Sequence, residues 1–277
     1  MNPEVSVLAN SLPRGGPFLL TSALQLLGYQ KFLGAEQYHS PAAFNYLEAK
    51  KALQGRQTSA AENMIGISPF SPCYLEKSLL QNSLNYLSQN EYIMAHIAYN
   101  PALSEAVMNA NCRHIVILRD PRSLLLSLLF DTHVMPRFLI EPFTLLSVEQ
   151  QLDFMLSGGK IPQTEMTLIG FVAMYQSMLQ WLHTPHCLVV RFEDLAGSQG
   201  GGSQEQQYIT LKNMAAFLNM SFDTSIEEKM DQIKDPSIPT FRLDQQKQWE
   251  NTISPNIIER VLSVCETLVI EAGYCPL

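Results

Sequence analysis

Short runs of apolar and β-branched residues alternate along this chain with segments of helical periodicity, and no other pattern limits the fold as strongly. Three runs predict strands over Val5–Ser11, His114–Leu118 and Cys187–Arg191, and Tyr92–His96 is a weaker fourth candidate. Strands that alternate with helices form a parallel sheet covered on both faces. We therefore expect an α/β fold with a central parallel sheet flanked by helices, in a single domain over residues 1–277.

Apolar residues at helical spacing predict the helices between and after these strands. The expected ranges are Phe18–Leu27, Ala102–Ala110, Pro121–Phe130, Met166–Leu182, Tyr208–Leu218 and Ser254–Ala272. Asp120 and Ser254 are the expected N-caps, each followed by a proline at the first helical position. The glycine-rich stretch 197–203 predicts a flexible surface loop. Residues 40–90 are polar, and we expect helices and loops over the sheet edge there.

The net charge of the chain indicates which kinds of partner it can bind. The 18 basic and 26 acidic residues give a net charge of −8. Phosphate backbones are held by clustered cations, so we expect no nucleic-acid partner. A local basic pocket for one small anion is compatible with this charge, and the acidic excess favours neutral or cationic substrates.

No apolar run approaches the roughly 20 residues of a membrane-spanning helix, and no cationic stretch precedes an apolar run at the N-terminus. The 5 cysteines are scattered, and no pair has CxxC spacing. We therefore expect a cytoplasmic protein with reduced thiols, no membrane contact and no metal site.

The loop after the first predicted strand has the composition of an anion site. It contains Arg14, Gly15 and Gly16 and leads directly into a helix. Glycines let backbone amides approach an anion, and the helix N-terminus adds free N–H groups. The GxxxxGK[ST] pattern of a Walker A loop is absent. The alternative interpretation is an ordinary strand-to-helix turn.

The loop after the His114 strand carries a resemblance to a known family. It reads Arg-Asp-Pro-Arg-Ser-Leu-Leu-Leu-Ser from Arg119 to Ser127. This is similar to the 3′-phosphate motif of the PAPS-dependent sulfotransferases, Arg-Asn-Pro-Lys-Asp followed by three mostly apolar residues and Ser. The resemblance implies a P-loop-like sulfotransferase fold, with Arg119 and Ser127 on the 3′-phosphate of PAPS or its product PAP. The alternative is a capped helix with a salt-bridging arginine.

The first loop then resembles the 5′-phosphosulfate loop of the family, usually Pro-Lys-Ser/Gly-Gly-Thr. The resemblance implies that residues 14–18 contact the cofactor, namely Arg14, Gly15, Gly16, Pro17 and Phe18. Arg14 replaces the family lysine and Pro17 replaces the threonine, which removes a hydroxyl and an N–H. Thr21 and Ser22, one turn later, are candidate replacements for that hydroxyl.

Two further segments match the family in order. The segment Arg191-Phe192-Glu193-Asp194-Leu195 is similar to its strand-ending Arg-Tyr-Glu-Asp-Leu, where the acidic pair shapes the following loop. Arg242 lies seven residues before Trp249, as does an arginine of the family loop that closes over the nucleotide. The resemblance therefore implies a 3′-phosphate contact for Arg242. Phe171 aligns with a tyrosine that stacks on adenine, and packing in the helix core is the alternative for it.

Sulfuryl transfer uses a general base and a cation on the leaving phosphate. His96 lies 23 residues before Arg119, close to the spacing of the base histidine of the cytosolic branch, so the resemblance implies that His96 is the base and Arg14 the catalytic cation. In the family a lysine precedes this histidine by two residues, and here Met94 stands in its place. A core or surface histidine is the alternative for His96, and Glu36, in a region near Glu48, is the reserve base.

Together these matches predict a sulfotransferase that moves a sulfuryl group from PAPS to a hydroxyl, and less readily an amine, of a small molecule. The divergence from the animal pattern resembles soluble bacterial and cyanobacterial tailoring enzymes of secondary metabolism, so a cationic alkaloid in toxin biosynthesis is the suggested acceptor. The alternatives are a non-catalytic PAP-binding relative and a P-loop-type nucleotide kinase. A homo-oligomer is compatible with this prediction, and the sequence does not decide the oligomeric state.

Overall fold

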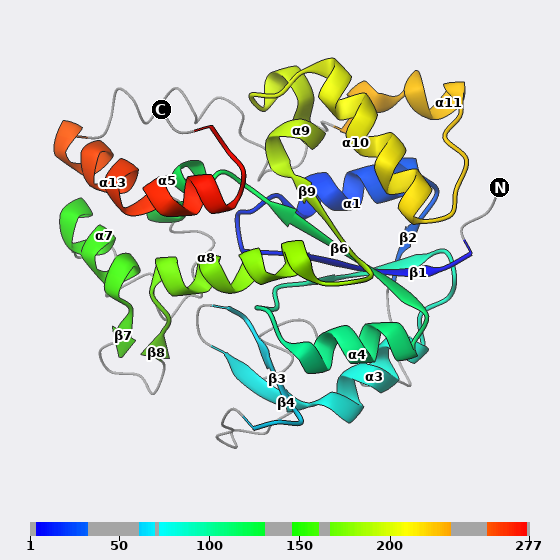
Figure 1. The fold of residues 1–277 in the computed structure, drawn as a ribbon, viewed down its shortest axis with the longest axis horizontal. Coiled ribbons are helices and arrows are strands. Elements are labelled where there is room, and N and C mark those ends of the chain that lie inside the picture. Colours follow the sequence, from blue (N-terminus) through cyan, green and yellow to red (C-terminus); the bar gives the residue numbers. More distant parts are fainter. Residues whose placement is uncertain are drawn as a thin grey trace.

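The computed structural model describes residues 4–32, 61–69, 72–130, 146–160, 167–233 and 254–275. Its centre is a five-stranded sheet in the order β2-β5-β1-β6-β9, with every neighbouring pair parallel (Figure 1). The strands are β1 (Ser6–Ser11), β2 (Gln30–Lys31), β5 (Glu91–Ala95), β6 (Cys112–Leu118) and β9 (Cys187–Arg191). The predicted central parallel sheet is confirmed, and β2 is a short edge strand that the sequence pattern did not indicate.

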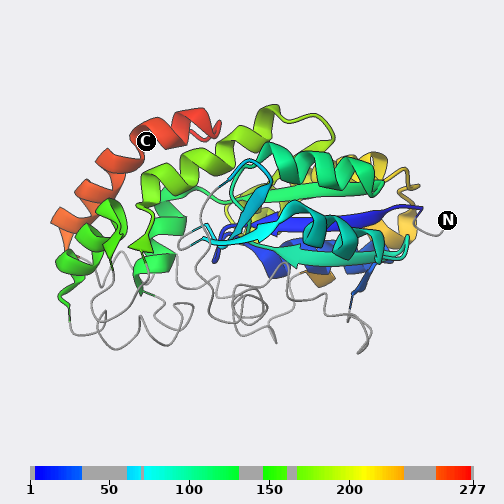
Figure 2. The same ribbon diagram turned by 90° about the horizontal axis from the view of Figure 1, so that it is seen from below.

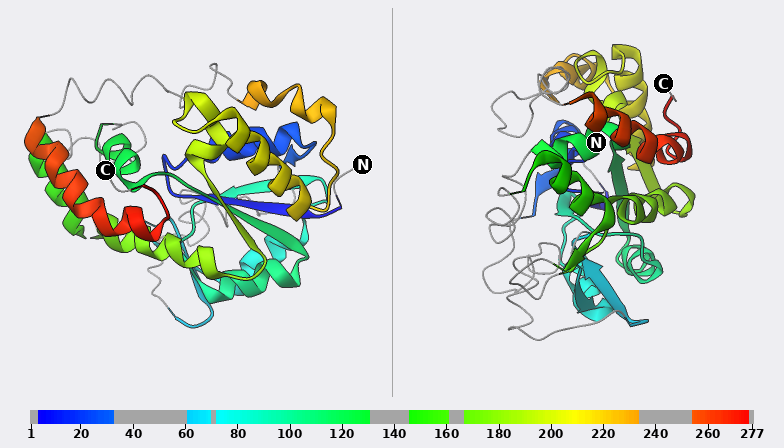
Figure 3. Two further views of the ribbon diagram at one scale, coloured as in Figure 1. Left: turned by 45° about the horizontal axis from the view of Figure 1, so that its top comes forward. Right: turned by 90° about the vertical axis from the view of Figure 1, so that its left-hand side faces the viewer.

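Helices cover both faces of this sheet, as predicted (Figures 1 and 2). One face carries α1 (Pro17–Leu26), α9 (Phe192–Ala196), α10 (Gln204–Phe217), α11 (Thr224–Glu227) and a 3-10 turn (Met230–Ile233). The other carries α3 (Lys77–Asn85), α4 (Pro101–Asn109) and α8 (Phe171–Leu179). Beyond the carboxyl edge of the strands lie α5 (Pro121–Phe130), α7 (Val148–Ser157) and α13 (Pro255–Glu271), and α13 packs on α5 and α8 (Figure 3).

Alternate residues of the longer strands of this sheet enter two separate hydrophobic cores. In β6, Ile115 and Ile117 pack toward α1 and α10, whereas Val116 and Leu118 pack toward α4 and α8. Because both faces of the sheet are buried, the strand sequences are nearly continuous apolar runs. This double burial is why the central strands were recognisable from sequence.

Residues 61–69 and 72–90 form a hairpin and a helix beside the sheet edge. Strand β3 (Met64–Ile67) pairs antiparallel with β4 (Cys73–Glu76), and α3 follows directly. A single bridge joins Ile67 to Ile97, just after β5. The hairpin therefore rests against the chain that leaves β5.

The predicted helix over Met166–Leu182 is wrong at its start. Residues Thr167–Leu168 form strand β8, which pairs with β7 (Gly159–Lys160), and α8 begins only at Phe171 before a 3-10 turn over Gln180–His183. Gly170 precedes the helix at a close crossing, where a Cβ would lie 2.4 Å from the carbonyl oxygen of Leu156. Contact with α7 therefore sets the start of α8, and helical periodicity carries no information about that contact.

The glycine-rich stretch is a packed turn, not the flexible surface loop that its composition predicted. A 3-10 turn covers Gly197–Gln199, and the Gly197 carbonyl accepts from the N–H groups of Gly200 and Gly202 at 2.9 and 3.0 Å. A Cβ at Gly202 would lie 2.4 Å from the carbonyl oxygen of Glu193. The glycines serve close packing on α9.

Both predicted N-caps lie where expected. The Asp120 carboxylate accepts from the Arg122 N–H at 2.9 Å, and α5 follows it. Ser254 precedes α13, but its side chain makes no capping hydrogen bond. Among the helices that the structure describes, none combines the length and apolarity needed to cross a membrane.

The buried His114 predicts acid-sensitive stability. Its ring is 2% exposed, packs edge-on to Trp181 at 4.5 Å, and its Nε2 has no hydrogen-bond partner among the described residues. Burial lowers the pKa of His114 from 6.5 to about 3. Because the unfolded chain binds this proton first, the free energy of unfolding should fall by about 1.4 kcal/mol per pH unit from pH ~6.5 toward ~3.

Urea unfolding at several pH values, compared with His114→Phe, measures this slope. His114→Phe should lose the part of the pH slope that one proton contributes. The control His183→Gln, at an exposed position, should keep the wild-type slope. Equal slopes in the wild-type protein and His114→Phe would contradict the prediction.

Candidate active site

The predicted site residues gather where the sheet connections change direction. From β1 the chain passes through α1 to β2 on one side, and from β6 it passes through α5 and α8 to β9 on the other. Since β1 and β6 are neighbours, their carboxyl ends form the topological switch point of the sheet. Ligands of open α/β sheets bind in the crevice at such a point.

The loop after β1 is tightly folded around two left-handed residues. Arg14 has φ 66° and Gly16 has φ 99°, and the Gly15 N–H donates to the Leu12 carbonyl at 2.9 Å. A Cβ at Gly16 would lie 2.4 Å from the Phe192 ring, so only glycine fits there. The N–H of Gly15 is used within the turn, by its hydrogen bond to Leu12. This role was not foreseen from the sequence.

The N-terminus of α1 supplies the remaining amides of this loop. Pro17 is the first helical residue, and its cap residue Gly16 has no side chain to accept from the first-turn N–H groups. Such a terminus favours an anion. Phe18 is 40% exposed on this turn, whereas Thr21 is buried and its hydroxyl donates to the Phe18 carbonyl at 3.1 Å. The Thr21 hydroxyl is therefore engaged within the helix in this structure, and its role as a replacement for the hydroxyl missing at position 17 stays a prediction.

The two predicted phosphate loops meet at their arginines. Arg14 donates from Nε to the Ser127 hydroxyl at 3.3 Å, and Arg119 donates from Nη1 to the Arg14 carbonyl at 3.2 Å. The Arg119 guanidinium also lies over the Phe192 ring, 4.7 Å from its centroid. Tertiary folding thus brings together Arg14, Arg119 and Ser127, which the sequence assigned to one cofactor.

Arg119 is a cation with unused hydrogen-bonding capacity. Its Nε is buried and has no partner among the residues that the structure describes. Burial lowers the pKa of Arg119, the Glu193 carboxylate opposes this, and the neighbouring Arg14 lowers it further. Two close cations and an unpaired buried donor favour a ligand of several negative charges at this point.

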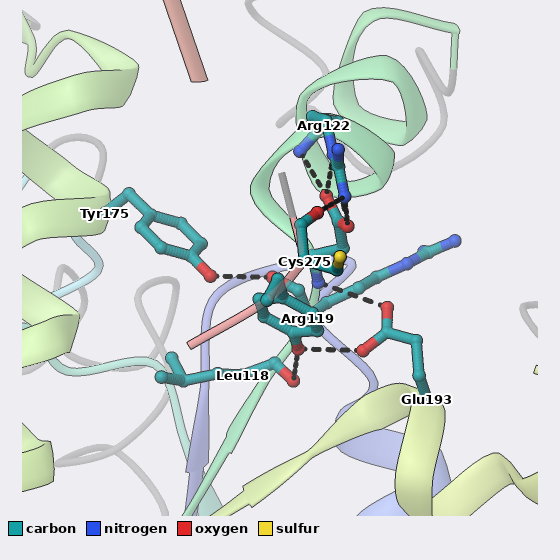
Figure 4. A network of polar contacts seen from close by, with 8 residues as sticks. Leu118, Arg119, Arg122, Tyr175, Glu193 and Cys275 are labelled. Atoms are coloured by element: carbon teal, nitrogen blue, oxygen red, sulfur yellow. Dashed lines mark hydrogen bonds and ion pairs between the residues drawn. The ribbon is translucent and has the colours of Figure 1, made fainter. Parts of the chain in front are cut away.

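A polar network behind Arg119 was not foreseen from the sequence (Figure 4). Glu193 accepts the Asp120 N–H at 3.1 Å and the Tyr274 hydroxyl at 2.7 Å, and the Tyr175 hydroxyl donates to the Arg119 carbonyl at 2.8 Å. Burial raises the pKa of Glu193, and these hydrogen bonds oppose the rise. The motif indicated a loop-shaping role for Glu193, whereas no sequence signal marked Tyr274.

His96 follows β5 and lies beside the start of the loop after β1. Its Nδ1 is 2.9 Å from the Ser11 carbonyl oxygen. A carbonyl only accepts, so Nδ1 carries the proton and Nε2 is left with a lone pair. Burial lowers the pKa of His96, which keeps the ring neutral near pH 7. In this tautomer the ring can accept a proton at Nε2.

Asn10 fixes the chain next to His96. Its side-chain amide donates to the Ile97 carbonyl and accepts the Ile97 N–H, both at 2.9 Å. Asn10 is fully buried at the end of β1. The two bonds fix the backbone groups of Ile97, the residue directly after His96.

The remaining predicted site residues are Phe171, Arg242 and Glu36. Phe171 is fully buried in the core at the start of α8, with its ring centroid 5.9 Å from that of Tyr175, which favours core packing over adenine stacking. Arg242 and Glu36 lie outside the described residues. Within the described ranges, no group of three or more His, Cys, Asp or Glu residues is arranged to hold a metal ion.

Comparison with known proteins identifies the fold. No protein-family model and no curated protein sequence matches the chain. Among solved structures, the mouse sulfotransferase SULT7A1 complexed with PAP matches 97% of this chain and 87% of its own, at TM-score 0.51 and 15% identity. A retinol dehydratase in complex with retinol and PAP matches 97% of this chain and 82% of its own, at TM-score 0.51 and 10% identity. The chain therefore has the fold of the sulfotransferases.

Proposed function

We propose that this chain is a PAPS-dependent sulfotransferase that moves a sulfuryl group to a hydroxyl, and less readily an amine, of a small molecule. The observation that carries the proposal is the meeting of the two arginine loops at the switch point, through Arg14 to Ser127 and Arg119 to Arg14. PAP is also present in the two sulfotransferase-fold structures described above. The protein would act as one domain, in the cytoplasm.

In this proposal the two arginines bind different phosphates of the cofactor. Arg119 and Ser127 hold the 3′-phosphate, and the buried Nε of Arg119 supplies a charge-assisted donor to it. Arg14 and the N-terminus of α1 hold the 5′-phosphosulfate, with Gly16 giving the close approach. Arg242 belongs to the same proposal as a further 3′-phosphate contact. PAPS supplies the activated sulfuryl group.

His96 removes the acceptor proton. As the acceptor oxygen forms its bond to sulfur, the bond from sulfur to the bridging phosphate oxygen breaks, and Nε2 of His96 takes the hydroxyl proton. Arg14 stabilises the negative charge that develops on the leaving phosphate. The Nδ1–H bond to Ser11 holds the required tautomer, and it also stabilises the imidazolium that forms.

The acceptor is the least defined part of the proposal. The net charge of −8 favours a neutral or cationic molecule, and an alkaloid of secondary metabolism fits that chemistry. Single-turnover transfer from labelled PAPS to a panel of alcohols and amines would identify the class. Binding of PAP with no transfer to any acceptor would favour a non-catalytic relative, and Mg²⁺-dependent phosphoryl transfer would favour a kinase.

PAP should raise the melting temperature more than AMP, because only PAP carries the 3′-phosphate that Arg119 and Ser127 contact. A ligand at a hundredfold excess over its Kd stabilises the folded state by about 2.7 kcal/mol. Thermal unfolding with matched concentrations of PAP, AMP and ATP measures the difference. Equal shifts for PAP and AMP would contradict the proposed function.

A further inference from the structure

One peptide group of the proposed 3′-phosphate loop is held at both of its ends. The carbonyl oxygen of Arg119 and the N–H of Asp120 belong to the same planar unit. The oxygen accepts from the Tyr175 hydroxyl at 2.8 Å, and the N–H donates to the Glu193 carboxylate at 3.1 Å (Figure 4). With both ends bonded, this plane cannot rotate without losing a hydrogen bond, so the backbone torsions between Arg119 and Asp120 are fixed, and with them the position of the backbone from which the Arg119 side chain extends.

Tyr274 completes this arrangement from the C-terminal tail. Its hydroxyl lies 2.7 Å from the second carboxylate oxygen of Glu193 and 3.2 Å from the Leu118 carbonyl oxygen. A phenol has one proton to donate. The Glu193 carboxylate is both the closer and the stronger acceptor, so it receives this proton. Tyr274 thereby fixes the rotation of the Glu193 side chain, which in turn holds the Asp120 N–H.

The tail itself is anchored by two arginines. Arg191 donates to the Ala272 carbonyl at 3.4 Å, and its guanidinium lies 5.2 Å from the centroid of the Tyr274 ring. Arg122, which is paired with Asp120, donates to the Cys275 carbonyl at 3.3 Å (Figure 4). Contacts from β9 and α5 therefore converge on residues 272–275, directly after α13.

Glu193 orients the loop without neutralising its cation. Among the described residues it forms no ion pair with Arg119, and its two oxygens are directed to the Asp120 N–H and the Tyr274 hydroxyl. A direct ion pair would have engaged the guanidinium of Arg119 itself. The arrangement instead fixes the backbone and leaves the Arg119 guanidinium available to an anion.

We propose that Tyr274, acting through Glu193, and Tyr175 are positioning residues that hold Arg119 for the 3′-phosphate of the cofactor. This inference rests on the proposed function, since it assigns the C-terminal tail to that same site. Tyr274 touches neither the cofactor nor the acceptor in this proposal. It acts only by orienting the peptide from which Arg119 extends.

The test compares PAP with AMP by calorimetry in the full chain. Tyr274→Phe removes only the hydroxyl and should weaken PAP binding by about tenfold, at the low end of the loss of a hydrogen bond to a charged group. AMP lacks the 3′-phosphate, so its affinity should change by less than about twofold by the same reasoning. Tyr208→Phe, which deletes a hydroxyl on α10 outside this network, is the matched control and should leave both affinities unchanged.

A double-mutant cycle adds a readout that a merely structural role would not move. If Tyr274 acts through Glu193, then Glu193→Gln combined with Tyr274→Phe should weaken PAP binding by less than the product of the two single effects. Independent effects would overturn the route through Glu193. Should Tyr274→Phe fail to fold, Tyr175→Phe tests the other end of the same peptide, with the same expected selectivity for PAP.

The possible failures are distinguishable. A wild-type protein that binds PAP no better than AMP overturns the proposed function, and this inference with it. A wild-type protein that prefers PAP, together with a Tyr274→Phe variant that keeps the same preference, overturns only the positioning role. Equal weakening of PAP and AMP in the variant would likewise overturn it, because the tail would then support the fold as a whole.

Discussion

Replacing His96 with alanine should lower kcat for sulfuryl transfer by at least about 100-fold, since a positioned general base contributes roughly 10²- to 10⁴-fold. PAP affinity should change little, because the proposed role of His96 is toward the acceptor proton and not toward the 3′-phosphate, which Arg119 and Ser127 are proposed to hold. Loss of kcat with KM for PAPS intact identifies an interaction made in the transition state. Rapid-quench kinetics with labelled PAPS separate the chemical step from product release.

The pH profile gives the His96 prediction a second readout. Transfer should slow as the pH falls, because a protonated imidazole cannot accept the acceptor proton. Burial lowers the pKa of His96, so the fall should begin below pH 6.5. The exposed His183, replaced by alanine, is the matched control. A His96→Ala enzyme that keeps more than about a tenth of wild-type kcat, with chemistry rate-limiting, would overturn the assignment and make Glu36 the next residue to test.

Replacing Arg119 with alanine should weaken PAP binding by roughly 10- to 100-fold, the contribution of a hydrogen bond to a charged group. The loss should be small for AMP, which carries no 3′-phosphate. Arg119→Lys should recover only part of the affinity, because a compact ammonium cannot reproduce the planar fork that lies over Phe192. Isothermal titration with both nucleotides measures the change.

Arg260 offers the control for this experiment. It is an exposed arginine on α13 that pairs with Asp153 on α7, and it belongs to neither of the two arginine loops. Arg260→Ala should leave the affinity for PAP unchanged. If Arg119→Ala also leaves it unchanged while the variant remains folded, Arg119 does not hold the 3′-phosphate.

Much of the fold followed from local pattern. The strands around Val7 and Val116 are buried on both faces, so each is a short apolar run followed by a helix, and the parallel sheet is confirmed. The loop after β1 was recognisable because Arg14 and two glycines stand directly after such a strand, and the loop after β6 because it resembles the 3′-phosphate motif of the sulfotransferases. The roles of His96, Arg119 and Ser127 stay predictions.

Other features depended on contacts between distant segments. The start of α8 at Phe171 follows from packing against α7. The glycines of 197–203 are constrained by the backbone of α9, whereas their composition alone indicated a mobile loop. Periodicity and composition describe one segment at a time, and so they could not reveal these crossings.

The site divides in the same way. The sequence determined which side chains of the chain can bind an anion or accept a proton, because charge, glycine and helix caps are local properties. Only the tertiary structure decided the tautomer of His96, through the carbonyl of Ser11 85 residues away. It also brought Tyr274 to Glu193, across 81 residues, and so linked the C-terminal tail to the loop of Arg119. Such hydrogen bonds leave no periodic trace in sequence, because each joins two positions that nothing but the folded sheet brings together.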